Sequence, residues 1–141
     1  MKMKINPLMV ATALVFATPA VADDIHETVA TNLAHAIPNL PGKSLVAVEV
    51  NYPPGGSSRP HRHAKSAFIY AYVVSGTIES QVEGEPAHTY RAGESFFETP
   101  GAHHVLGRNV SATEPAKLLA VFVVDTADKE LTTLIDKDTL S

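Results

Sequence analysis

The stretch His61-Arg62-His63 lies six residues after Gly55 and is followed about forty residues later by Pro100-Gly101-Ala102-His103-His104. Side chains along a β-strand point alternately to its two faces, so the imidazoles of a His-x-His triplet project from one face and can bind one ion. Imidazole nitrogen suits zinc, copper, iron and nickel, and a third histidine from another strand would extend the set of ligands. We expect this third ligand to be His104, and the two stretches therefore predict a metal site carried by strands.

From residue 45 onward, short runs rich in β-branched and aromatic residues alternate with turn residues. Ser75-Gly76 and Glu83-Gly84-Glu85-Pro86 favour hairpin turns, and Pro53-Pro54-Gly55-Gly56-Ser57-Ser58 reads as a loop. Evenly spaced strands without intervening helices predict an all-β sandwich or small barrel rather than a parallel-sheet fold. The expected strands are 45–50, 67–74, 77–82, 87–91, 95–98, 103–106 and 117–124.

The segment 24–37 has a different pattern, with apolar residues four apart: Ile25, Val29, Leu33 and Ile37. This spacing is typical of one face of a helix, and Pro38 would end it. We therefore predict a short N-terminal helix and linker over 23–44, a β-domain over 45–125, and a tail over 126–141. The tail is polar and has no clear period, so it is either a loosely attached end or a strand at the edge of a dimer.

The first 22 residues have the layout of a secretory signal, which predicts a periplasmic or secreted protein. Lys2 and Lys4 precede an apolar stretch that is too short to span a bilayer, and Ala20-Val21-Ala22 precedes Asp23. Cleavage after Ala22 would leave 119 of the 141 residues, which fits one domain of ordinary size.

Charge and cysteine content exclude several classes of function. The formal charge of −4 becomes −6 when Lys2 and Lys4 are removed, which argues against nucleic acid or an anionic membrane as a partner. The chain contains no cysteine, so disulfides, thiolate metal ligands and cysteine nucleophiles are excluded.

The first histidine motif resembles that of the cupin family, which runs glycine, five residues, His-x-His, three or four residues, glutamate, six residues, glycine. Gly55, His61 and His63 match its beginning, and Gly76 matches its end. Counting back from Gly76 places the metal-binding glutamate of the family at Ile69, so the glutamate is missing.

The second motif of the family runs glycine, five residues, proline, one residue, glycine, two residues, histidine, three residues, asparagine. Gly93, Gly101 and His104 match it, whereas Thr99 replaces the proline and the asparagine comes one residue late, as Asn109. Adjacent strand residues point to opposite faces, so only one of the two neighbouring histidines should bind metal, and the family spacing favours His104 over His103. The resemblance implies a cupin jelly roll and a homodimer.

Because the family glutamate is missing, other residues near the histidines are considered as metal ligands or bases. Glu98 ends the strand before the Pro-Gly turn and would replace it as a ligand or act as a base; the alternative is a surface carboxylate. Alternation places Tyr70 and Tyr72 on the face opposite Ile69, although another register would bring Tyr72 into the pocket. Arg59 and Arg62 would attract a substrate carboxylate or serve only solubility. No role is assigned to the remaining histidines: His26, His35 and His88.

Three functions remain open. The first is an enzyme acting on a small molecule, for which the resemblance implies dioxygenase, isomerase, lyase or decarboxylase chemistry, with Fe, Mn, Ni, Cu or Zn as the divalent metal. The second is a binding module that captures a metal ion or small ligand without turnover. The third is a structural cupin whose pocket is empty or filled by Ile69. An inward Glu98 side chain favours the enzyme.

Overall fold

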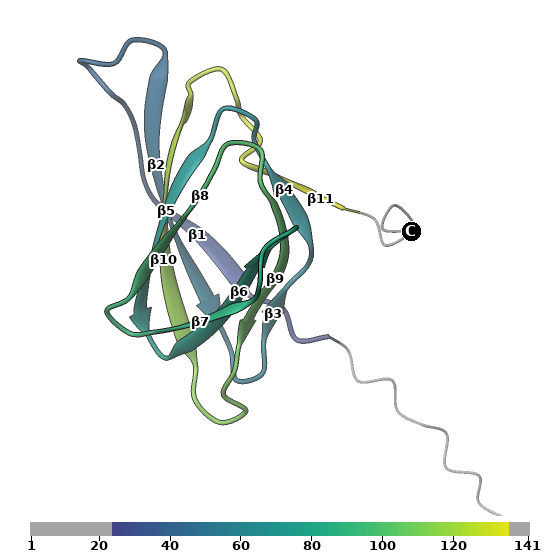
Figure 1. Ribbon diagram of the computed structural model, residues 1–141. Coiled ribbons are helices and arrows are strands. Elements are labelled where there is room, and N and C mark those ends of the chain that lie inside the picture. Colours follow the sequence, from purple (N-terminus) through teal and green to yellow (C-terminus); the bar gives the residue numbers. More distant parts are fainter. Residues whose placement is uncertain (1–23, 136–141) are drawn as a thin grey trace, which may run out of the picture.

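Two antiparallel sheets form the part of the chain that the computed structural model describes, residues 24–135 (Figure 1). In spatial order the first sheet contains β1 (Thr28–Ala36), β2 (Lys43–Tyr52), β10 (Ala116–Asp125), β5 (Phe68–Ser75) and β8 (Ser95–Glu98). The second contains β11 (Thr132–Leu134), β4 (His61–His63), β9 (His103–Asn109), β6 (Thr77–Val82) and β7 (His88–Arg91), and β3 (Ser57–Ser58) also pairs with β9. The predicted all-β jelly roll is confirmed.

Strand β10 shows how the first sheet separates a core face from an outer face. Its buried and half-buried residues alternate, and Leu118, Ala120 and Phe122 belong to the hydrophobic core. Ala120 lies opposite Val48 of β2 and Ala71 of β5, so three central strands contribute apolar side chains to one layer. Burying a side chain of this kind contributes about 1.5–3 kcal/mol for the larger residues. The inner face of this sheet is therefore an apolar wall.

The second sheet carries the histidine motifs on adjacent strands. β4 lies between β11 and β9, and His61 is the direct partner of His104 across the β4–β9 pair. On its other side His61 pairs with Leu134 of β11. The pairing thus brings the two histidine stretches together although they are far apart in the sequence.

The predicted N-terminal helix is wrong: residues 28–36 form strand β1, paired antiparallel with β2. A spacing of four residues fits one helix face, but it also fits one strand face, because four is a multiple of the strand period of two. The β-branched residues Thr28, Val29 and Thr31 suit a strand. The register shifts between Thr31 and Leu33, so the strand contains an irregularity that no simple periodicity would reveal.

Both ends of the described region pair with the sheets. Part of the predicted tail forms β11, and the sheets extend beyond the predicted 45–125 domain on either side. The predicted signal peptide over residues 1–22 lies outside the described residues. Within residues 24–135 we find no helical segment with the length and apolarity that crossing a bilayer requires.

Candidate metal centre

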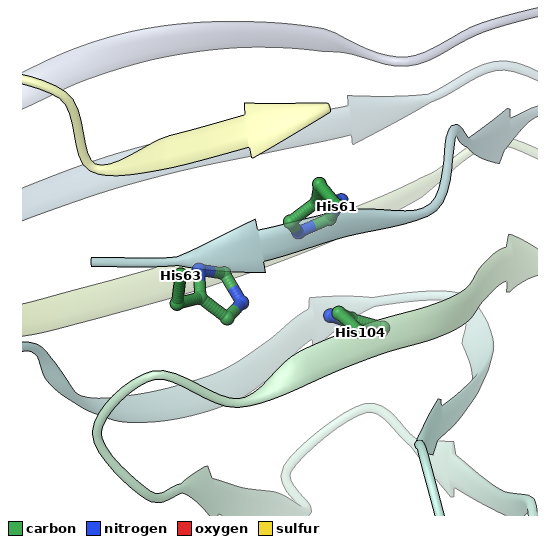
Figure 2. A group of neighbouring side chains, drawn as sticks. All are labelled: His61, His63 and His104. Carbon is green, nitrogen blue, oxygen red and sulfur yellow. The ribbon is translucent and has the colours of Figure 1, made fainter. Parts of the chain in front are cut away.

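Three histidines converge between β4 and β9, as Figure 2 shows. One ring nitrogen from each of His61, His63 and His104 lies within 4.8 Å of the others. His63 and His104 are each 6% exposed, and His61 is half-buried. These three residues could hold a metal ion, as the sequence predicted.

Contacts behind the imidazoles determine which nitrogens face the site. His61 Nδ1 donates to the carbonyl oxygen of Arg59 at 2.8 Å, and His104 Nε2 donates to that of Leu106 at 2.6 Å. The Oγ atom of Ser80 lies 3.1 Å from the same His104 nitrogen. Hydrogen bonds of this type orient metal-binding histidines and leave the opposite nitrogen free to coordinate.

The protonation of His61 also suits a ligand. Burial lowers the pKa of His61 to about 4, with the Arg59 carbonyl opposing the shift and the rings of His104 and His63 adding to it. The imidazole is therefore neutral near pH 7, and neutral imidazole is the form that binds metals.

Glu98 points into this site and is only 4% exposed, so the surface alternative for its side chain is wrong. Its Oε2 lies 2.9 Å from His63 Nε2, and its Oε1 lies 3.1 Å from His104 Nδ1. Burial alone would raise the pKa of Glu98, but the contacts with His104 and His63 outweigh it and hold the pKa well below its usual range. In the β5–β8 pair, Glu98 is the direct partner of Ile69.

Several buried polar atoms at this point lack a hydrogen-bond partner among the described residues: His63 Nδ1, His63 Nε2 and Glu98 Oε2. The close approach of His63 to Glu98 thus does not have the angles of a hydrogen bond. Leaving such a group unsatisfied costs roughly 1–3 kcal/mol. A divalent ion would satisfy a carboxylate oxygen and an imidazole nitrogen together, so this donor set fits a metal.

The histidines open onto a cavity of about 340 Å³ between the two sheets. Ile69 lines this cavity and does not fill it. Sequence reasoning missed Tyr52, whose hydroxyl lies 2.8 Å from Ser58 Oγ in the same lining. Burial raises the pKa of Tyr52 to about 12, so it keeps its proton. Alternation from Val48 through Val50 could have indicated that Tyr52 faces inward.

One glycine, Gly107, lies close beside the site. A Cβ atom on Gly107 would lie 3.2 Å from both His104 Nε2 and the Tyr52 hydroxyl. Gly107 lies on the same strand as His104, and the absence of a side chain there leaves room for the imidazole and for the Tyr52 hydroxyl.

Other residues singled out in the sequence lie elsewhere. His103 faces away and its Nδ1 is 2.7 Å from a Glu83 carboxylate oxygen. Tyr72 is 36% exposed on the outer face, so the register that would bring it into the pocket is wrong. Arg59 lines the cavity, whereas Arg62 is exposed on the opposite face of β4.

The remaining histidines differ in their surroundings. His26 lies in the cavity lining with its Nδ1 3.3 Å from the Ser57 carbonyl oxygen. His35 Nδ1 contacts the carbonyl oxygen of Ala36, and His88 is exposed on β7.

Comparison with known proteins identifies the family and the fold. The profile of a family described as "Cupin domain" matches residues 48–122. No protein of curated function matches the chain in sequence. An uncharacterized conserved protein with a double-stranded beta-helix domain from Klebsiella pneumoniae has a TM-score of 0.62 at 19% identity, covering 89% of this chain and 100% of the other.

Two enzymes share the fold over part of their length. Recombinant oxalate oxidase in complex with glycolate has a TM-score of 0.61 at 22% identity, covering 80% of this chain and 57% of the other. The DMSP lyase DddQ from Ruegeria pomeroyi has a TM-score of 0.52 at 23% identity, covering 64% of this chain and 42% of the other. This chain therefore spans less than two thirds of either enzyme, and the likeness concerns the fold.

Proposed function

Because the chain belongs to the cupin family, we propose that it is a metal-dependent enzyme acting on a small molecule, of dioxygenase or related type. A divalent transition metal ion (Fe, Mn, Ni, Cu or Zn) would be held by His61, His63 and His104. The observation that carries this proposal is the buried group of His63 and Glu98 atoms without hydrogen-bond partners at the point where the histidines converge.

Glu98 takes the part of the missing family glutamate in this proposal. Its distances of 2.9 and 3.1 Å to His63 and His104 are those of groups sharing an ion. Imidazole combined with carboxylate suits iron and manganese, whereas imidazole alone suits copper and zinc. When bound, the ion would supply Lewis-acid or redox chemistry. The Glu98 carboxylate either completes the ligand set or accepts a proton from a substrate held in the cavity.

An enzyme is favoured over a purely structural protein because the cavity is present beside the histidines. Its volume of about 340 Å³ lies in the range of small-molecule sites. Two fold neighbours are named as enzymes, an oxidase and a lyase. Capture of a ligand without turnover would use the same cavity, and a substrate screen of the metal-loaded protein distinguishes the two.

We also propose export and a homodimer. The signal-like residues 1–22 support a periplasmic or secreted location. The outer face of the first sheet supports a symmetric partner, because exposed aromatic residues adjoin there, including Phe97 at 64%, Phe68 at 43% and Tyr70 at 45%. In the proposed dimer, this apolar face would pack against the same face of a second copy about a two-fold axis.

Elemental analysis of protein purified without chelator tests the metal proposal. We expect about one equivalent of a divalent transition metal, and its loss from the His61→Ala, His63→Ala double variant with the fold retained. A second comparison uses neighbouring residues: His104→Ala should lose the metal and His103→Ala should keep it, because His103 faces Glu83. Full occupancy in the double variant, or no metal after reconstitution, would refute the assignment.

A further inference from the structure

The cavity has one polar side and one apolar side. The three histidines project from β4 and β9 of the second sheet, and side chains from β2, β5 and β10 of the first sheet form the facing wall, with Glu98 on β8 at the edge of that wall. Strands β2, β5 and β10 contribute Val48, Val50, Tyr52, Ile69, Ala71, Leu118, Ala120 and Phe122, which are apolar except for the Tyr52 hydroxyl. Because that hydroxyl already lies 2.8 Å from Ser58 Oγ and the rest of the wall offers no side-chain hydrogen-bond partner, a polyhydroxylated ligand would leave most of its polar groups unsatisfied there, at a cost of roughly 1–3 kcal/mol each.

The apolar wall directly adjoins the histidines. The ring of Phe122 lies 5.6 Å from that of His63, in an edge-on arrangement. A ligand that places a donor atom beside His63 therefore brings the adjoining part of its structure close to Phe122. The part of the ligand next to its donor group is thus the part that is removed from water.

Charge sets a second condition on the ligand. Among the described lining residues, the ionisable groups besides the histidines and the tyrosine are Glu27, Arg59 and Glu98. Arg59 is exposed and Glu27 half-buried, so their opposite charges belong to the outer part of the cavity. A divalent ion with three neutral histidines and the Glu98 carboxylate leaves one net positive charge inside. One further negative charge balances it, whereas a second would stand uncompensated beside an apolar wall, which is costly.

We infer that the site takes small monoanions with an apolar body, and that it disfavours compact dianions. This inference rests on the proposed metal site and specifies its substrate class. It separates this chain from the oxalate oxidase that shares its fold, because oxalate is a dianion without an apolar part. The shared fold thus does not extend to a shared substrate.

A homologous series of 2-oxo acids tests the inference, with affinity measured by calorimetry on the metal-loaded protein. Pyruvate, 2-oxobutanoate, 2-oxopentanoate and 2-oxohexanoate present the same two oxygens and differ only in methylene groups. Burial of each methylene should tighten binding roughly fourfold, which amounts to roughly sixtyfold from pyruvate to 2-oxohexanoate. Oxalate, with the same donor spacing and twice the charge, should bind more weakly than 2-oxohexanoate.

A pair of variants on β10 tests whether the gain of affinity with chain length arises from the apolar wall. Ala120→Leu adds bulk on the cavity side and should remove most of the gain with chain length while pyruvate still binds. Val121→Leu is the matched control, since strand alternation places this residue on the outer face. Val121→Leu should show the same increase of affinity with chain length as the unaltered protein.

The outcomes separate this inference from the proposed function. Metal content is measured on the same samples, and a protein without metal would overturn both. A protein that holds its metal but binds oxalate most tightly, or shows no dependence on chain length, would overturn the inference alone. The series on the unaltered protein decides the matter even if Ala120→Leu fails to fold.

Discussion

At the scale of single residues, burial determines the protonation of His61, because it lowers the pKa of this imidazole from the ordinary 6.5 to about 4. In an unfolded chain the same ring would take up a proton near pH 6.5. Between these two values the unfolded chain binds more protons than the folded one, so acid favours unfolding there.

We therefore predict that the metal-free protein loses stability as the pH falls from 6.5 to 4. The contribution of His61 is fully present above pH 6.5 and should decline by roughly 2–3 kcal/mol by pH 4. Urea unfolding of the unaltered protein and of His61→Gln at pH 7, 5 and 4 measures it as the difference between the two. His88→Ala, on an exposed residue, is the control and should parallel the unaltered protein. Parallel curves for His61→Gln would contradict the assignment.

Strand alternation was enough to predict the direction of most of these side chains. It placed His61 and His63 on one face, separated His104 from His103, and kept Tyr70 apart from Ile69. The contacts of Glu98 could not be derived in this way, because they depend on which strands become neighbours in space. The sequence pointed to Glu98 as a candidate carboxylate, and only the sheet register shows what it touches.

At the scale of strands, the pairing of β5 with β8 offers an explanation for the departure from the family motif. Ile69 occupies the family position of the glutamate, and its direct cross-strand partner is Glu98. Both side chains point inward, at 1% and 4% exposure. Directly opposed residues have Cβ atoms roughly 4.5–5.5 Å apart. A carboxylate can therefore reach the same ion from either strand.

Exchanging the two residues tests this explanation. Glu98→Ile alone should weaken metal binding by roughly tenfold or more, and the added Ile69→Glu change should restore most of the affinity. Competition with a chelator of known affinity provides the measurement. The control exchanges the adjacent outward pair, Tyr70→Phe with Phe97→Tyr, and should leave the metal affinity unchanged. A double variant no better than Glu98→Ile would show that the carboxylate must come from β8.

Strand β1 is the element for which the spacing of apolar residues predicted the wrong structure. Apolar residues at every fourth position satisfy a helix face and a strand face equally well. The segment becomes a strand because β2 presents an edge along residues 44–51, with which β1 pairs. That edge exists only in the folded sheet. Tertiary pairing, and not local spacing, therefore determines that this segment is a strand.

At the scale of the molecule, the first sheet has an apolar outer face that the described chain leaves uncovered. β5 exposes Phe68, Tyr70, Tyr72 and Val74, and β8 exposes Phe97 beside them. Exposed patches of apolar side chains commonly mark an interface. The order of the strands within each sheet could not be predicted from the sequence, since β10 lies between β2 and β5, which precede it by many residues.

Light scattering coupled to size-exclusion chromatography tests the dimer. We expect twice the protomer mass for the unaltered protein, and weakening of self-association by roughly a hundredfold or more in Tyr70→Lys, Phe97→Lys, because two buried aromatic anchors are lost from each protomer. Thr89→Lys adds a charge on an exposed residue of the other sheet and should leave the dimer intact. A monomeric unaltered protein would refute the interface.

The central place of β10 also bears on how the proposed metal site would be filled. A chain made from its N-terminus presents all three histidines before residues 116–125 enter between β2 and β5. Pairings between such distant segments form slowly. Until then the imidazoles remain open to any ion in solution, and copper would win on affinity alone. For the proposed metal site, we therefore expect the compartment in which β10 inserts to select the metal, through the timing of folding and the local supply of ions.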